Sequence, residues 1–184
     1  MREPEPETIR RAQAGDLLAF ERLVRHYQAD LWRFAFHLTR NRAAADDVTQ
    51  ETFIKAYRAI GSYRGQWKFT SWLLRIARNC AVDAYRKTRR EGPVSIDDSL
   101  GEPDRQAPAG GSGHSDERLR LQEAIRQLPM PLREPFVVIE VLGFNYQEAS
   151  AILGVKVGTV KSRMHRARAA LIRTLTEGEA AGEM

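Results

Sequence analysis

The chain has 184 residues, enough for one large domain or two small ones. Apolar residues make up 42%, charged residues 29%, and the formal net charge is +5. This composition predicts a packed core and an anionic partner, either nucleic acid or a membrane surface. The charged, proline-rich start argues against a signal peptide, and the longest apolar run is too short for a membrane span. We therefore expect no membrane insertion and a cytoplasmic location, which the single Cys80 also fits.

Apolar periodicity predicts three helices in the first ninety residues. An i, i+3, i+4 stripe runs from Phe20 to Leu38 and indicates one long helix. A second helix is expected over residues 43–60, followed by the turn-rich aromatic loop "GSYRGQW". The third helix is expected to begin with Thr70 as its N-cap and to end in a basic segment near Arg90.

Residues 91–116 differ in composition from both flanks. They contain three prolines, the run "GGSG", and six acidic residues against Arg105 alone. The segment is expected to be a flexible acidic linker, and a plain solvated tether explains its composition equally well. It divides the chain into an N-terminal domain (1–90), the linker (91–116) and a C-terminal domain (117–184).

The C-terminal block is also predicted to be helical. One helix is expected from Ser115 or Asp116 to Leu128, a second over "LREPFVVIEVL" after a proline break, and a third from Tyr146 to Leu153. The last is expected from Thr159 to Leu175, after a turn that contains Gly154. No segment has the pattern of a strand, so the predicted class is all-α, with two small helical domains.

The last two helices have the form of a helix-turn-helix, a short helix and a basic helix joined by a glycine-containing turn. No acidic residue occurs between Glu148 and Glu177, as expected for a surface that faces phosphates. The second helix of such a motif enters the major groove with its N-terminal residues at the base edges. A solvated basic helix face is the competing interpretation.

Nothing in the sequence points to catalysis or to a cofactor. The four histidines lack metal-ligand spacing, and no nucleophile and base fall into a recognisable pair. We expect no enzyme activity, no cofactor and no metal, and we expect Cys80 to be a buried structural thiol.

Two separate motifs resemble a known family. Asp47, Gln50, Glu51 and Phe53 fit a D-x-x-Q-E-x-F helix, and "WLLRIARNCAVD" from Trp72 fits the helix that follows it. The pattern resembles domain 2 of the bacterial extracytoplasmic-function sigma factors, and "YQEASAILGVKVGTVKSRMHRARAAL" resembles their domain 4. Ala149-Ser150 departs from the family pattern, which usually has a bulkier residue followed by alanine.

The resemblance implies a dissociable specificity subunit that binds core RNA polymerase and promoter DNA. Domain 2 would contact the β′ clamp helices and open the minus-ten element, and domain 4 would contact the β flap and read the minus-thirty-five element. A regulatory anti-sigma factor is left open. The alternatives are a helix-turn-helix regulator that binds duplex DNA independently of polymerase, and a protein-interaction module.

The resemblance and the side-chain chemistry together give three candidate residue sets. The core-polymerase set lies on the second helix and consists of Asp46, Asp47, Gln50, Glu51, Phe53 and Tyr57. For Phe53 and Tyr57 the alternative is a place in the hydrophobic core. Trp72 is expected mainly in the core, and Phe69 is alternatively a core residue. The minus-ten set combines aromatic and cationic groups suited to binding single strands: Tyr63, Arg64, Trp67, Lys68, Arg75, Arg78, Asn79 and Arg86. The minus-thirty-five set consists of Thr159, Lys161, Ser162, Arg163, Arg166 and Arg168. Lys161 and Arg163 are expected to contact base edges, and Arg166 and Arg168 are expected to contact phosphates.

Overall fold

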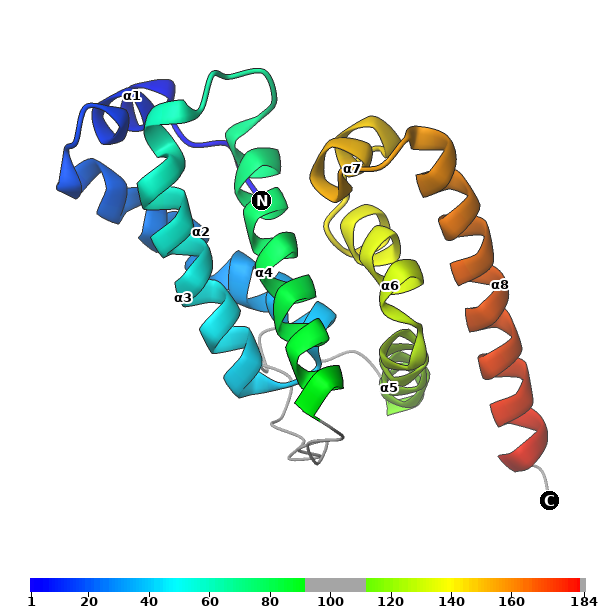
Figure 1. Ribbon diagram of the computed structural model, residues 1–184. Coiled ribbons are helices and arrows are strands. Elements are labelled where there is room, and N and C mark those ends of the chain that lie inside the picture. Colours follow the sequence, from blue (N-terminus) through cyan, green and yellow to red (C-terminus); the bar gives the residue numbers. More distant parts are fainter. Residues whose placement is uncertain (92–111, 183–184) are drawn as a thin grey trace.

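The computed structural model describes residues 1–91 and 112–182, and all regular structure within these ranges is helical (Figure 1). The elements in chain order are α1 (Pro6–Gln13), α2 (Leu17–Thr39), α3 (Arg42–Ala59), the 3-10 turn η1 (Ile60–Ser62), α4 (Phe69–Glu91), α5 (Ser112–Gln127), α6 (Met130–Phe136), the π-helical segment η2 (Val137–Val141), α7 (Tyr146–Leu153) and α8 (Val157–Gly182). The predicted all-α class is confirmed. Residues 92–111 of the predicted acidic linker lie outside the described residues.

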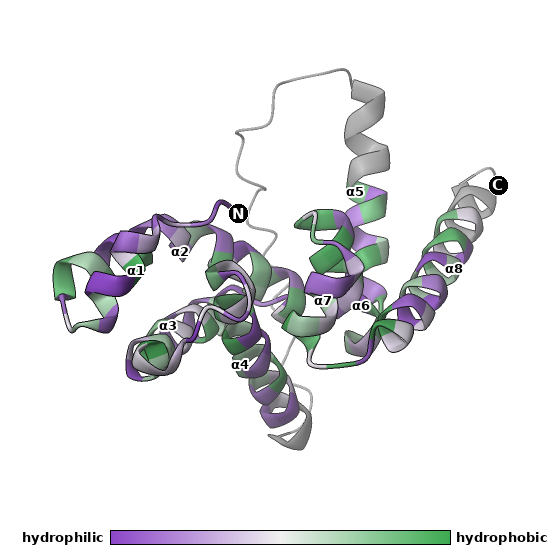
Figure 2. Ribbon diagram, turned by 90° about the horizontal axis from the view of Figure 1, so that it is seen from above, coloured by the Kyte–Doolittle hydropathy of each residue, from purple (hydrophilic) through white to green (hydrophobic). Residues whose placement is uncertain are grey.

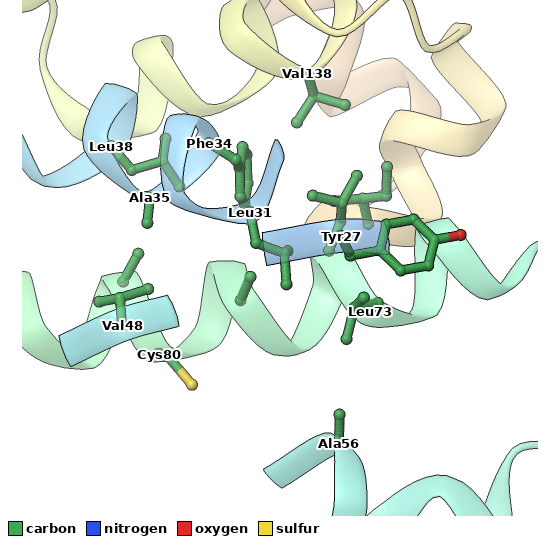
Figure 3. Close-up of a cluster of buried hydrophobic side chains, with 14 of the residues drawn as sticks. Tyr27, Leu31, Phe34, Ala35, Leu38, Val48, Ala56, Leu73, Cys80 and Val138 are labelled. Atoms are coloured by element: carbon green, nitrogen blue, oxygen red, sulfur yellow. The ribbon is translucent and has the colours of Figure 1, made fainter. Parts of the chain in front are cut away.

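The N-terminal half is built around α2, which contacts α1, α3 and α4. Asp16 caps α2 by accepting the N–H groups of Leu18 and Ala19, and Arg40 ends it in the left-handed conformation at φ 61°. The predicted stripe is the buried face of the helix, since Leu23, Tyr27, Leu31, Phe34 and Leu38 are all nearly inaccessible to solvent. Figure 3 shows several of these side chains gathered against residues of α3 and α4. Burial of each large apolar side chain contributes about 1.5–3 kcal/mol.

The start of α4 differs from the expectation. The predicted N-cap, Thr70, is instead the second residue of the helix and is buried, with its hydroxyl 2.9 Å from the Tyr27 hydroxyl. The carboxylate of Glu3 caps the helix from far away in the sequence, because it accepts the N–H groups of Phe69 and Thr70. The N-cap prediction was therefore wrong: the hydroxyl is taken up by a tertiary partner.

The C-terminal half contains α5 to α8. Helix α5 begins at Ser112, a few residues before the predicted start, and α8 begins at Val157, two residues before Thr159. Asn145 and Glu148 form a reciprocal capping box at the start of α7. Gly154 ends α7 at φ 65°, the left-handed position that its place in the turn predicts. Ser150, the departure from the family pattern, donates its hydroxyl to Val155 O at 2.6 Å and stabilises the same turn.

The two halves pack against each other. Helix α4 runs beside α7, and α2 contacts α6 (Figures 1 and 2). Val138 of η2 belongs to the same buried cluster as Phe34 of α2 and Leu73 of α4 (Figure 3). The guanidinium of the buried Arg133 donates to Leu38 O of the N-terminal half at 2.8 Å and to Leu128 O of its own half at 2.6 Å. Its desolvation lowers the pKa of Arg133 to about 10.

Candidate nucleic-acid and polymerase interface

The loop between η1 and α4, residues 61–68, exposes an aromatic ring beside cations. Trp67 is 52% exposed, and Arg64 and Lys68 are exposed on the same loop. Tyr63 is half-buried, donates its hydroxyl to Trp67 O at 2.7 Å, and packs its ring edge-on against Phe69 at 5.4 Å. The loop is therefore fastened from inside, while an indole that could stack on a base faces outward.

Phe69 and Trp72 lie toward the core, and Tyr63 of the minus-ten set packs with them instead of facing outward. Phe69 is buried, and Trp72 is half-buried with its ring 5.2 Å from that of Phe69 and 5.3 Å from that of Tyr63. These three rings form an aromatic support under the loop. Cys80 on the same helix is buried, as expected for a structural thiol.

The polar residues of the minus-ten set on α4 do not share one environment. Arg75, Asn79 and Arg86 are exposed, whereas the side chain of Arg78 is only 22% exposed. Arg78 donates from Nε and Nη2 to the two carboxylate oxygens of Glu134 on α6, at 2.8 and 3.1 Å. Glu134 itself is buried.

Lys68 and Arg75 of the minus-ten set also lie against the C-terminal half. Lys68 Nζ lies 2.7 Å from Glu148 Oε1 on α7. Arg75 Nη2 lies beside Gly154, at 3.9 Å from the position that a Cβ atom would have there. The hydrogen bond from Lys68 holds the pKa of Glu148 below its ordinary value, and the pKa of Lys68 is raised in return. In this arrangement α6 and α7 cover part of the surface that the sequence assigns to promoter DNA.

The polymerase set lies on the outer face of α3. Asp46, Asp47, Gln50 and Glu51 are exposed. Phe53 is half-buried and packs on the core, and Tyr57 is 47% exposed with its ring 5.0 Å from that of Phe20. The face thus has an aromatic centre with a polar edge, as the sequence predicts, and Phe53 serves partly as a core residue.

Two of these carboxylates already have partners within the N-terminal half. Trp32 donates from Nε1 to Asp46 Oδ1 at 2.6 Å, and Lys55 pairs with Glu51 at 3.3 Å.

Helix α8 separates an apolar face from a basic one. Val160, Met164, Ala167 and Leu171 are buried against the rest of the C-terminal half. Four members of the minus-thirty-five set are exposed, namely Lys161, Ser162, Arg166 and Arg168. The other two, Thr159 and Arg163, are half-buried. Because α8 starts at Val157, Thr159 lies in its first turn and Lys161 and Arg163 lie in the second.

One cation of this set is paired within the protein. Arg168 Nη2 lies 2.6 Å from Glu140 Oε1, and this hydrogen bond raises the pKa of the guanidinium.

Sequence reasoning missed three charged residues that structure this region. Glu148 had a local signal, since Asn145 and Glu148 are spaced as a capping box. Glu134 and Arg133 had none, because their partners Arg78 and Leu38 lie far away in the sequence.

Some features do not occur in the residues described. No group of three His, Cys, Asp or Glu side chains within 1–91 and 112–182 could hold a metal ion. None of the described helices has the length and apolar character needed to cross a membrane.

Comparison with known families and proteins gives consistent matches. Residues 23–91 match the profile described as Sigma-70 region 2, and residues 118–171 match Sigma-70, region 4. The chain is 34% identical over 182 residues to the RNA polymerase sigma-H factor of Pseudomonas aeruginosa, covering 94% of each chain. It is 38% identical over 174 residues to the ECF RNA polymerase sigma-E factor of Escherichia coli K12, covering 89% of this chain and 90% of the relative.

Two solved structures are similar in fold. CnrH, solved in complex with the cytosolic domain of CnrY, superposes with a TM-score of 0.68 at 27% identity, over 92% of this chain and 96% of CnrH. The sigma factor RpoE of Bartonella quintana, solved with the anti-sigma factor NepR, superposes with a TM-score of 0.66 at 30% identity, over 85% of this chain and 96% of RpoE.

Proposed function

Because this chain belongs to the extracytoplasmic-function sigma factors of the sigma-70 family, which direct RNA polymerase to specific promoters, we propose that its two halves divide promoter recognition between them. Residues 1–90 act at the minus-ten element, residues 117–184 act at the minus-thirty-five element, and residues 91–116 connect them. The protein is a specificity subunit and not a catalyst. The region 2 match over residues 23–91 speaks against an autonomous helix-turn-helix regulator, whose N-terminal block would be an unrelated effector domain.

The loop of residues 61–68 captures a base from the non-template strand during promoter opening. The observation that carries this proposal is the 52% exposure of Trp67 on a loop that is otherwise fastened to the core. An exposed indole beside Arg64 and Lys68 combines the stacking surface and the cations that single-strand binding requires. Stacking of one base on an aromatic side chain contributes about 1–3 kcal/mol.

Helix α4 continues this surface with hydrogen-bonding and cationic groups. In this proposal Asn79 bonds a base edge, and Arg75 and Arg78 bind phosphates; Asn79 and Arg75 are exposed on the surface of α4. Arg86 extends the basic surface toward the upstream duplex. Arg78 can serve DNA only after it leaves Glu134, so promoter binding requires the two halves to separate.

The outer face of α3 binds core RNA polymerase at its β′ clamp helices. Exposed Tyr57 and half-buried Phe53 supply the apolar centre of this contact. The polar edge consists of Asp46, Asp47, Gln50 and Glu51, all exposed in the free protein. Such a mixture is usual for an interface that must also dissociate.

The C-terminal half binds the β flap and reads the minus-thirty-five element with α8. Lys161 and Arg163, with Thr159 and Ser162 beside them, lie near the start of the helix, where a recognition helix meets the base edges. Arg166 and Arg168 lie further along and hold phosphates.

An anti-sigma factor is a further partner of this chain. Support comes from CnrH and RpoE, whose structures were solved with the cytosolic domain of CnrY and with the anti-sigma factor NepR. Such an inhibitor would compete with core polymerase for the face on α3. A pull-down from native cells that recovers polymerase alone under every growth condition would contradict this partner.

The decisive experiment adds the protein to core RNA polymerase. Transcription from a genomic library with mapped start sites identifies the promoters, and open-complex formation is then compared between the wild type and Trp67→Ala. We expect Trp67→Ala to weaken opening by about 1–3 kcal/mol. Ile172→Ala, which truncates another exposed apolar side chain, serves as the control and should leave opening unchanged. Equal opening by Trp67→Ala and the wild type would remove the loop from the mechanism.

A further inference from the structure

The loop of residues 61–68 is held at both ends by the segment that precedes α2. This N-terminal arm, residues 1–16, contributes one polar side chain to each end. At the first end, Gln13 Nε2 donates to Ile60 O at 3.1 Å and to Tyr63 O at 2.8 Å. At the second end, Glu3 accepts the N–H groups of Phe69 and Thr70, each at 3.0 Å.

Glu3 replaces a local helix cap. The first N–H groups of an α-helix have no partner within the helix, and the N-terminus carries a partial positive charge. No acidic residue lies in the first turn of α4. The two carboxylate oxygens of Glu3 satisfy the N–H groups of Phe69 and Thr70 and place a negative charge at this end.

Gln13 is the last residue of α1 and acts as a donor at the other end of the loop. The two carbonyl groups that it joins belong to Ile60, the first residue of the 3-10 turn, and to Tyr63, the residue that follows the turn. A glutamate of the same shape would present acceptors to two carbonyl oxygens. The position therefore depends on the amide hydrogens and not only on side-chain size.

The arm is itself anchored to the core, so Glu3 is not free to drift. Arg2 O accepts the hydroxyl of the buried Tyr27 at 3.0 Å and lies 2.9 Å from His26 Nε2. The same Tyr27 hydroxyl lies 2.9 Å from Thr70 Oγ1. Tyr27 thus links the arm directly to the start of α4.

We propose that Glu3 and Gln13 are positioning residues for minus-ten recognition. They fix the loop backbone so that Trp67 and Arg64 face the captured base in one conformation. This inference rests on the proposed role of the loop. Both residues lie before residue 23, where the region 2 match begins, and their bonds go to backbone atoms at residues 60, 63, 69 and 70.

The test uses the full chain assembled with core polymerase and a set of promoters that differ by single bases in the minus-ten element. For Glu3→Ala we expect the preference for the captured base to fall about tenfold, which corresponds to about 1.4 kcal/mol. Preference at the minus-thirty-five element should remain unchanged. Glu7→Ala makes the same charge change on the arm, where Glu7 pairs with Arg10, and it should match the wild type.

Two isosteric variants separate positioning from folding. Glu3→Gln retains one acceptor oxygen and should give an intermediate loss, and Gln13→Glu should lose base preference as fully as Gln13→Ala. Amide hydrogen exchange in the free protein gives an independent reading. Exchange at Phe69 and Thr70 should accelerate in Glu3→Ala, while exchange at Leu31 in the core of α2 should stay as slow as in the wild type.

The outcomes are distinguishable. A loss of opening that is equal for every base variant would indicate a merely structural arm and would overturn the inference. Unchanged base preference in both Glu3→Ala and Gln13→Glu, with a changed preference in Trp67→Ala, would also overturn it while leaving the proposed function in place. Unchanged behaviour of Trp67→Ala would instead remove the proposed function.

Discussion

Arg78 of α4 and Glu134 of α6 form a two-point ion pair that joins the halves of the protein, with N–O distances of 2.8 and 3.1 Å. Glu134 is buried, and a buried carboxylate that loses its cation is strongly destabilised. One guanidinium cannot bind this carboxylate and a DNA phosphate in the same geometry. The ion pair in the docked arrangement and the binding of Arg78 to promoter DNA therefore exclude each other.

Substitutions of Arg78 and Glu134 should affect the docking of the two halves and the binding of DNA to different extents. Arg78→Ala leaves Glu134 buried without its cation and should destabilise the docked arrangement by about 3–5 kcal/mol. Glu134→Gln weakens the pair and keeps the cation, so it should bind and open promoters at least as well as the wild type. The separation of the halves can be measured as the distance between fluorophores at the exposed positions 28 and 172.

A third variant supplies the control for this pair. Arg78→Met with Glu134→Leu replaces the pair by apolar groups, which is often neutral for packing. It should keep the halves docked and still lose affinity for DNA. Full promoter affinity in this double variant would remove Arg78 from the DNA surface.

The face on α3 should dominate binding to core polymerase. Gln50→Ala with Tyr57→Ala removes a polar and an aromatic contact, and aromatic anchors at interfaces often contribute more than about 2 kcal/mol. Titration of labelled core polymerase measures the loss, and circular dichroism checks helicity. Arg22→Ala is the control, because Arg22 is an exposed cation on α2 and lies outside the proposed face on α3. Wild-type affinity for core polymerase in the folded double variant would show that this face of α3 is not part of the interface.

The two groups of cations on α8 should respond differently to substitution. Arg163→Ala should cost about 1–3 kcal/mol and relax the preference at one base pair. Arg168→Ala should weaken all promoters alike and reduce the salt slope by about one. Glu140→Gln releases Arg168 from its internal partner and should strengthen binding without altering base preference. Reversed behaviour of the two arginine variants, measured in the holoenzyme at several salt concentrations, would show that the helix sits differently in the groove.

His37 should make stability fall in mild acid. Burial, followed by the nearby cations Arg126, Arg133 and Arg33, lowers the pKa of His37 below 6.5. The unfolded chain then binds a proton in a range where the folded chain does not, so unfolding becomes easier as the pH falls below about 6.5. The contribution is fully present above that pH. Urea unfolding at pH 7.5 and 5.5 should show the loss in the wild type and a smaller one in His37→Gln, and equal losses would contradict this role.

The core of α2 should be the most sensitive part of the fold. Leu31 is fully buried, and Leu31→Ala should lower the free energy of unfolding by about 2–5 kcal/mol. Leu18→Ala, on the exposed start of the same helix, should have little effect. Similar destabilisation by both variants would place the core elsewhere.

Local patterns carried much of the fold. The apolar stripe from Phe20 to Leu38 could be predicted from helical periodicity, and the turn at Gly154 could be predicted from the chemistry of glycine. These predictions succeeded because the interactions lie within a few residues of one another.

Long-range pairing could not be read in the same way. Glu3 caps a helix that begins 66 residues further along the chain, so the residues near the start of α4 gave the wrong prediction, Thr70. The docking of the two halves had one signal in the sequence, the apolar run that contains Val137 and Val138, and both of these side chains are fully buried. Which surface would cover it depends on tertiary packing and not on the sequence nearby.

The most direct test of the account is site-specific photocrosslinking in the promoter complex. A photoreactive amino acid replaces Trp67 in one holoenzyme and Arg163 in another. The account predicts that position 67 crosslinks to the non-template strand of the minus-ten element and that position 163 crosslinks to the duplex of the minus-thirty-five element. Crosslinks from position 67 to the template strand or to polymerase alone would contradict it.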